Sequence, residues 1–228
     1  MINKLLDRIT DFSGEAYGVV LTEPEGPYRL DFVDKQGTTN RSAIDQWLFQ
    51  SKDFGISIAF PVLGFRWQAT RYSDSLLFGA WYGAAEMETA IAESVHHWVK
   101  FVNDAFPDNK AEITSKRTLY RVKVDSILVD LRDKHVEFPQ LLDPKFYGFT
   151  QQIGEYLYRR EMTGILVKST DILNGTSIVI FKPEALSDVV EVCKLTYRHN
   201  PRDKKVMVKR HDTGNTIEIY ASAPKYLI

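Results

Sequence analysis

The sequence predicts an α+β fold, in which a mixed β core has flanking helices. Short alternating or β-rich segments recur along the chain and are separated by turn signals such as Asn174-Gly175. Apolar residues spaced three and four apart from Met87 to Val102 predict one clear amphipathic helix. Strands and helices do not alternate regularly, as they would in a doubly wound parallel sheet. With 44% apolar residues, the chain can build a sizeable core around these elements.

Residues 1–60 are predicted to form an N-terminal extension that acts as a lid or as a partner-binding segment. Pro24-Glu25-Gly26-Pro27 is a strong turn signal between two β-rich stretches. The patterns in this region predict helices over residues 3–12 and 42–51, and strands over 17–22 and 28–33.

Residues 61–185 are predicted to form the catalytic core, and 186–228 a β-rich segment packed on it. The tail contains Asp212-Thr213-Gly214-Asn215, which supplies the turn of a C-terminal β-hairpin. The core is expected to contain helices over 87–102 and 148–160 and strands over 77–84, 118–124, 165–168 and 177–181. The tail is expected to contain strands over 189–197, 205–209 and 216–220.

Net charge, cysteine content and the length of apolar runs limit which binding partners and which cellular compartment we expect. The formal net charge is −1, so no global field draws the protein to nucleic acid or to an anionic membrane. Cys193 is the only cysteine, which rules out an intramolecular disulfide and favours a buried, inert thiol in a reducing compartment. The chain has no uninterrupted apolar run of about 18 residues. We expect a cytoplasmic protein and leave homo-oligomerisation open.

Two arginines, Arg66 and Arg71, lie five residues apart among aromatic residues. A guanidinium presents a planar fork that grips phosphate through two hydrogen bonds, so the pair could hold a pyrophosphate. The alternative is that both are surface residues whose stems cover aromatic neighbours.

Tyr82 lies in a predicted strand and is followed by Gly83-Ala84. Its ring offers a flat face for stacking a nicotinamide or adenine ring, and the small residues after it would let a ligand approach the backbone. The alternative is a core aromatic beside Trp81.

Glu93 lies on the predicted helix but away from its apolar stripe. It is therefore either a solvated glutamate or a carboxylate that lines a cleft, where it would stabilise an oxocarbenium-like transition state. Ser169 ends a predicted strand; its hydroxyl would bind a phosphate or orient a leaving ring, and the alternative is an ordinary turn serine.

No metal site is predicted. His96 and His97 are adjacent, so on a helix their side chains point about 100° apart and cannot form the zinc pair of residues i and i+4. The glycine-rich patterns of dinucleotide-binding and P-loop folds are absent from the sequence, so any NAD site here is not of the Rossmann type.

These motifs together resemble the RES-domain family, named for arginine, glutamate and serine. The resemblance covers about residues 60–185. One departure is that Lys168-Ser169-Thr170-Asp171 lacks the arginine that often follows the family's serine, and Asp171 would repel a pyrophosphate that it faced. The matching positions are Arg66, Arg71, Tyr82-Gly83-Ala84, the Thr89-Ala90-Ile91-Ala92-Glu93 run, and Ser169 with Asn174-Gly175.

The resemblance implies a fold like that of ADP-ribosyltransferases and a toxin of a bacterial toxin–antitoxin pair that depletes NAD by hydrolysis or phosphorolysis. NAD would be the substrate, with no other cofactor, and a small helix-turn-helix antitoxin would be the partner. Glu93, Arg66 and Tyr82 would be catalytic. Arg66, Arg71, Tyr82, Ser169 and Asn174 would bind NAD. Two alternatives are a mono-ADP-ribosyltransferase that modifies a protein, and an inactive binding module.

Overall fold

The computed structural model describes residues 2–21, 70–74, 78–105, 111–170, 172, 174–202 and 205–220. In this part of the chain, eight strands form one mixed sheet with helices packed against it, which confirms the α+β prediction. The α-helices are α1 (Ile2–Leu5), α4 (Met87–Ala105) and α5 (Gly148–Arg159). Short 3₁₀ turns are η3 (Lys134–Val136), η4 (Pro139–Leu142) and η5 (Pro183–Ala185). The strands are β1 (Ile9–Leu21), β2 (Trp81–Ala84), β3 (Ile113–Asp130), β4 (Gly164–Lys168), β5 (Thr176–Ile180), β6 (Leu186–Asn200), β7 (Lys205–Arg210) and β8 (Thr216–Tyr220).

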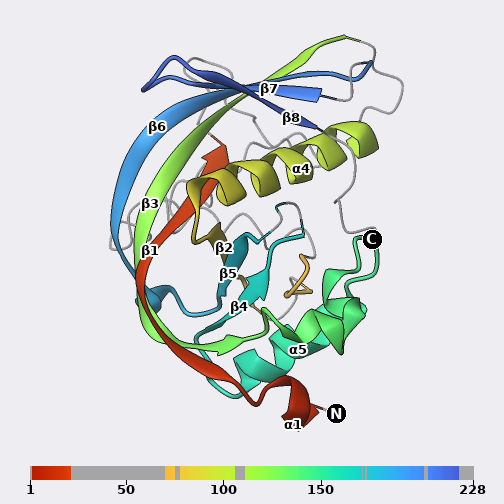
Figure 1. Ribbon diagram of the computed structural model, residues 1–228, viewed down its shortest axis with the longest axis vertical. Helices are drawn as coiled ribbons and strands as arrows, with labels where there is room; N and C mark the ends of the chain where they lie inside the picture. The colour runs from red at the N-terminus through yellow and green to blue at the C-terminus, as the bar shows by residue number, and fades with distance from the viewer. Residues whose placement is uncertain are drawn as a thin grey trace, which may run out of the picture.

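Five of the strands close on themselves. β1 pairs with both β2 and β3, and the remaining neighbours run β2–β5–β4–β3, so the five strands form a ring. β3 has β1 on one edge, while its other edge pairs first with β6 and then, at Val129 and Asp130, with β4. Only the β3–β4 pairing is parallel among the described strands. The long strands β1, β3 and β6 curve around α4, and β7 and β8 continue the sheet beyond it (Figure 1).

The first strand differs from the sequence prediction. The helix expected over residues 3–12 is only the short α1, and β1 then runs from Ile9 to Leu21, paired with β3 over its whole length. Residues 9–21 are therefore part of the central sheet and not an appendage, because their backbone hydrogen bonds are satisfied by β3. The elements expected over 28–33 and 42–51, and the rest of the predicted lid up to residue 60, lie outside the described residues.

Helix α4 buries the apolar stripe that the sequence predicted. Ile91, Val95 and Val102 are almost completely buried against β3, β6 and β7. Glu93 is only partly buried and lies off this stripe, as expected from 100° of rotation per residue. The side of α4 that carries Glu93 is therefore available for chemistry while the other side anchors the helix.

The C-terminal hairpin matches its prediction closely. β7 and β8 pair in register from Lys205↔Tyr220 to Lys209↔Thr216, and Gly214 in the turn has a φ of 73°, a value that glycine adopts without strain. Cys193 on β6 is 5% exposed, and burial raises the pKa of its thiol, as expected of an inert packing residue.

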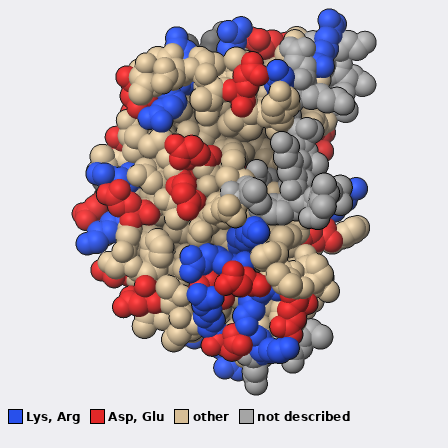
Figure 2. All heavy atoms as spheres, viewed as in Figure 1, with Lys and Arg blue, Asp and Glu red and all other residues tan. Residues whose placement is uncertain are grey.

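Charges of both signs are interspersed on the surface. Figure 2 shows basic and acidic side chains side by side in its lower part, where α1 lies in Figure 1. Ion pairs there join the N-terminal residues to the segment after β3: Lys4 with Glu137, Arg8 with Asp133, and Asp7 with Lys134. No helix in the described ranges is long and apolar enough to cross a membrane.

A buried carboxylate joins the start of β1 to the end of β3. Asp130 is 1% exposed, and its two oxygens accept hydrogen bonds from Nε and Nη2 of Arg132 at 2.9 and 2.7 Å. Arg8 Nε lies 3.3 Å from the same carboxylate. Burial by itself would raise the pKa of Asp130, but the hydrogen bonds from Arg132 and the charges of Arg132 and Arg8 outweigh it and lower that pKa.

We expect Asp130→Asn to lower the free energy of unfolding by about 1–2 kcal/mol at neutral pH, because it removes the charge from the hydrogen bonds with Arg132, whose side chain is partly exposed to solvent. A lowered carboxyl pKa contributes stability above its ordinary value near 3.8, and this contribution is lost as the pH falls through the lower value of the folded state. Urea unfolding of both proteins at pH 7 and pH 3 checks this. The gap should narrow at pH 3, and an equal gap at both values would contradict it.

Candidate active site

The centre of the site is the carboxylate of Glu93. Its Oε1 accepts a hydrogen bond from Ser169 Oγ at 2.7 Å and a second, short one from Ser177 Oγ. Ser169 is fully buried, and Ser177 is 7% exposed. One oxygen of the carboxylate is therefore held in place by two buried hydroxyls that come from a different part of the chain.

The two serines come from the hairpin that joins β4 to β5. Val167 pairs with Ser177, and beyond this pair the Ser169 N–H donates to the Gly175 carbonyl at 2.8 Å. Ser169 Oγ also accepts the N–H of Ile172 at 3.3 Å, which folds the turn back over the serine. Asn174 is exposed and has a φ of 67°, so it makes the left-handed turn and does not point a buried group at Glu93.

Helix α4 lies unusually close to this hairpin. A Cβ at Gly175 would lie 2.6 Å from Thr89 Oγ1 and 3.1 Å from the Ser169 Cβ, so only glycine allows this approach. Thr89 is one helical turn before Glu93. Glu86 adds a second link, because its Oε2 accepts hydrogen bonds from Thr89 Oγ1 at 3.0 Å and from the Thr176 N–H at 3.1 Å. The Thr-Ala-x-x-Glu run thus places its glutamate by packing its threonine on the turn.

Tyr82 holds the segment that carries Arg71. Its hydroxyl lies 2.6 Å from Thr70 Oγ1 and accepts the N–H of Tyr72 at 3.1 Å. Burial raises the pKa of Tyr82 to about 12, although these hydrogen bonds and the charge of Arg71 act in the opposite direction. The Tyr82 hydroxyl is therefore neutral and anchors residues 70–72. The stacking of a ligand ring on Tyr82 stays a prediction.

The small residues after Tyr82 do not open the backbone to a ligand as the sequence suggested. A Cβ at Gly83 would lie 2.1 Å from the ring of Trp81, and Ala84 is fully buried. The space beside Gly83 is thus filled by the Trp81 indole, which is itself only 2% exposed. These residues are small because a core aromatic packs on them.

Arg71 is partly buried, and one end of its guanidinium is already engaged. Its Nη1 donates to the carbonyls of Leu141 and Asp143 at 3.2 and 2.8 Å, and its guanidinium carbon lies 4.7 Å from the centroid of the Tyr147 ring. Tyr72, the next residue, is buried, and burial raises its hydroxyl pKa, with a contribution from the charge of Glu93. The charge of Arg71 acts on the same phenol in the opposite direction and lowers that pKa.

A comparison with protein families identifies the chain. A model of the RES domain matches residues 46–200, well over half of the sequence. The chain belongs to the RES-domain family. The matched region is wider at both ends than the 60–185 that the motifs suggested, yet β1 lies outside it.

Among solved structures, the crystal structure of the M. tuberculosis MbcT–MbcA toxin–antitoxin complex contains a chain similar to this RES-domain protein. The two are 15% identical, with a TM-score of 0.48, and the match covers 81% of this chain and 86% of that chain. No curated protein matches.

In this RES-domain protein, the structure brings Glu93 and Ser169 together, whereas Arg66 and Asp171 lie outside the described residues. Sequence reasoning missed Ser177, and it named Thr89 only as part of a motif, with no role of its own. Ser177 was within a predicted strand, and its only signal was a serine among Ile and Val, at an alternate position from Val179. A polar residue at such a buried strand position indicates a hydrogen-bonded partner.

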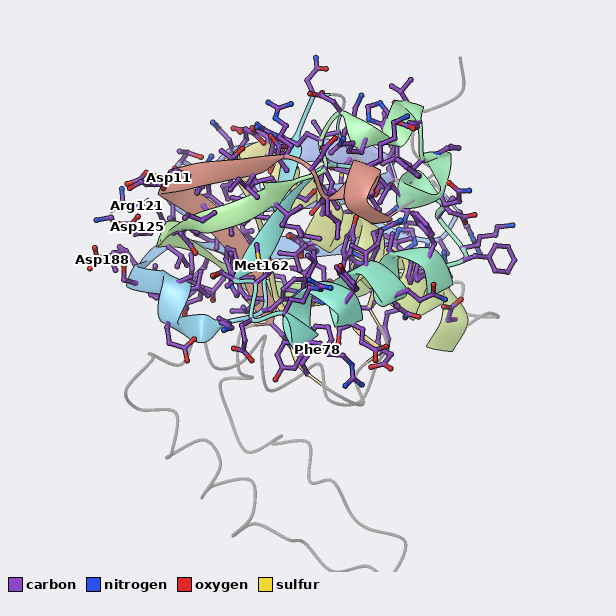
Figure 3. All side chains as sticks on the ribbon, turned by 90° about the horizontal axis from the view of Figure 1, so that it is seen from below. Asp11, Phe78, Arg121, Asp125, Met162 and Asp188 are labelled. Carbon is purple, nitrogen blue, oxygen red and sulfur yellow. The ribbon has the colours of Figure 1, made fainter. Side chains whose placement is uncertain are left out.

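The described residues contain no group of three or more His, Cys, Asp or Glu side chains placed to hold a metal ion. The rings of His96 and His97 lie 6.0 Å apart and are nearly perpendicular, at 78°. A hollow of about 310 Å³ is lined by residues of β1, β3 and β6, among them Glu15, Arg121 and Asp188; Figure 3 labels the last two at the same end of the molecule. Its charges partly neutralise each other, since Arg121 pairs with Glu15 at 3.0 Å.

Proposed function

We propose that this protein cleaves the nicotinamide–ribose bond of NAD, with water or inorganic phosphate as the acceptor. The observation that carries the proposal is the Glu93 carboxylate, fixed through one oxygen by Ser169 and Ser177. Membership of the RES-domain family supports it, because the family resemblance implies NAD as the substrate.

The chemistry requires a fixed negative charge and no acid. As the glycosidic bond breaks, positive charge develops on the ribose, and a pre-oriented carboxylate stabilises that charge without having to reorganise. Nicotinamide leaves as a neutral ring because the bond's electron pair returns to its positively charged ring nitrogen. Glu93 would stabilise the ribosyl cation, and the two serines would hold its carboxylate in position.

The rest of the proposal follows from the same site. Arg66 and Arg71 would bind the phosphates, Tyr82 would stack on the nicotinamide side, and the core would be of the ADP-ribosyltransferase type. We propose that the protein acts as a cytoplasmic toxin of a bacterial toxin–antitoxin pair, and that a small helix-turn-helix antitoxin covers the site.

The test is NAD consumption by the purified protein, in phosphate-free buffer and with added inorganic phosphate. Loss of NAD in both buffers identifies hydrolysis, and loss that requires phosphate identifies phosphorolysis. Labelled NAD with cell lysate provides the third arm, since label on a protein band would identify protein ADP-ribosylation. No turnover and no transfer in any arm would favour the inactive binding module and overturn the proposal.

We expect Ser177→Ala to lower kcat for NAD cleavage about tenfold with little change in KM, because it removes one of the two hydrogen bonds that orient Glu93. Ser169→Ala should cost more, since its hydroxyl also accepts the Ile172 N–H. Steady-state kinetics of both variants measures this. Ser187→Ala, at an exposed position on β6, is the matched control. Wild-type kcat in Ser177→Ala would remove Ser177 from the positioning role.

A further inference from the structure

A group of basic side chains from separate segments gathers around Tyr147, outside the Glu93 cluster. The Arg71 guanidinium carbon lies 4.7 Å from the centroid of the Tyr147 ring, and Lys100 Nζ lies 5.5 Å from the same centroid. His96 is one turn before Lys100 on α4. Burial lowers the pKa of His96, and the charges of Lys100 and Arg71 lower it further, so the three side chains share one electrostatic environment.

No carboxylate forms an ion pair with Arg71 or Lys100 among the residues that the structure describes, although backbone hydrogen bonds and also the charge of Arg71 lower the pKa of the Asp143 carboxyl. Arg71 contacts the backbone carbonyl of Asp143, while the Oδ1 of that residue accepts the N–H groups of Lys145 and Phe146 at 2.8 and 3.0 Å. Neither Arg71 nor Lys100 forms an ion pair with a described residue. Two cations held beside one ring, with no carboxylate in ion-pair contact with either, repel each other, and an anion bound between them would relieve that repulsion.

We propose that Arg71, Lys100 and Tyr147 form a subsite that binds a phosphoryl group, with Lys100 contacting that group directly. The inference rests on the proposed function, which it deepens by placing the anionic part of the substrate. Tyr147 contributes its ring, which holds both cationic stems in position through cation–π contacts.

The position of Lys100 on α4 relates this subsite to the reacting bond. Lys100 follows Glu93 by seven residues, so the two side chains leave the helix in nearly the same direction and about 10 Å apart along its axis. Glu93 would face the ribose whose glycosidic bond breaks. Lys100 would lie farther along the ligand, at the phosphoryl group next to that ribose. One helix, α4, would thus position both the reacting ribose and the neighbouring phosphoryl group.

The phosphoryl group has two sources, the pyrophosphate of NAD and inorganic phosphate as the acceptor. Kinetics of Lys100→Gln separates them. If the subsite binds the pyrophosphate, KM for NAD should rise about tenfold or more in phosphate-free buffer, with kcat nearly unchanged. If it binds inorganic phosphate, KM for phosphate should rise by a similar factor while phosphate-free turnover stays the same.

Four further variants sharpen this test. Lys100→Arg keeps the charge and should restore most of the affinity, whereas Lys209→Gln, at an exposed position on β7, should behave as wild type. Tyr147→Phe keeps the ring and should be mild, while Tyr147→Leu should reproduce part of the Lys100→Gln effect. Unchanged KM values for both NAD and phosphate in Lys100→Gln would overturn the proposal.

Calorimetry separates failure of the subsite from failure of the proposed function. ADP-ribose and inorganic pyrophosphate would be titrated into the wild-type protein and Lys100→Gln. Binding that weakens about tenfold in the variant supports the subsite even if the wild type does not cleave NAD. Equal binding to both proteins, or no binding to the wild type, overturns the subsite regardless of turnover.

Discussion

Glu93→Gln is expected to lower kcat for NAD cleavage by about 10²- to 10³-fold or more while the protein stays folded. The amide oxygen of glutamine can accept the same two hydroxyl hydrogen bonds, so the hairpin and α4 keep their contacts. What is lost is the negative charge that opposes the developing ribosyl cation, and preorganised electrostatic groups of this kind contribute that order of magnitude to catalysis.

The measurement is single-turnover NAD cleavage, with thermal unfolding in parallel. Glu88→Gln, an exposed position in the first turn of the same helix, is the matched control and should retain wild-type turnover. A midpoint of unfolding within a few degrees of wild type would show that the loss is chemical. Glu93→Gln turnover within tenfold of wild type would remove Glu93 from the catalytic role.

Gly154→Ala should be the most damaging single-methyl change in the described part of α5. A Cβ at this position would lie 1.9 Å from the backbone carbonyl oxygen of Tyr72, and backbone cannot swing aside as a side-chain tip can. Alanine is the better helix former by about 1 kcal/mol, but overpacking of this severity costs about 1–3 kcal/mol or more. We expect a net fall in the free energy of unfolding.

The same change should also weaken the site. Gln151 Nε2 donates to the Thr70 carbonyl at 2.9 Å, so α5 and the segment that carries Arg71 are held together one turn from Gly154. If Gly154→Ala pushes α5 away from the segment that carries Arg71, KM for NAD should rise more than kcat falls. Urea unfolding and steady-state kinetics measure the two effects. Gly148→Ala, whose added methyl would meet open space, is the control for stability, and equal stability of the two variants would contradict the prediction.

Local patterns predicted the elements whose periodicity was strong. The stripe of α4 was clear because Ile91, Val95 and Val102 recur at helical spacing, and the same spacing left Glu93 off the stripe. The β7–β8 hairpin followed from alternating strands on either side of a glycine-containing turn. In both cases the signal is a pattern of residues close in the chain, which a sequence window can capture, although the α4 stripe packs on distant strands.

The second half of β1 was predicted as a strand, but its first half was missed because its stability comes from a distant part of the chain. Residues 9–15 are mostly polar and include Gly14, so this half carries little β-propensity of its own. It is a strand because β3, about a hundred residues later in the chain, supplies its hydrogen-bond partners. β3 was likewise predicted only over 118–124, whereas pairing with β1, β6 and β4 extends it from Ile113 to Asp130.

The sequence by itself determined the α+β class, the helix that carries Glu93 and, through its motifs, membership of the RES-domain family. Only the tertiary structure decided that Ser177 joins Ser169 on one oxygen of Glu93, that Thr89 packs on Gly175 to bring them together, and that Lys100 meets Arg71 at Tyr147. The reason is physical: local spacing sets which face of an element a side chain occupies, whereas the packing of elements far apart in the chain sets which faces meet.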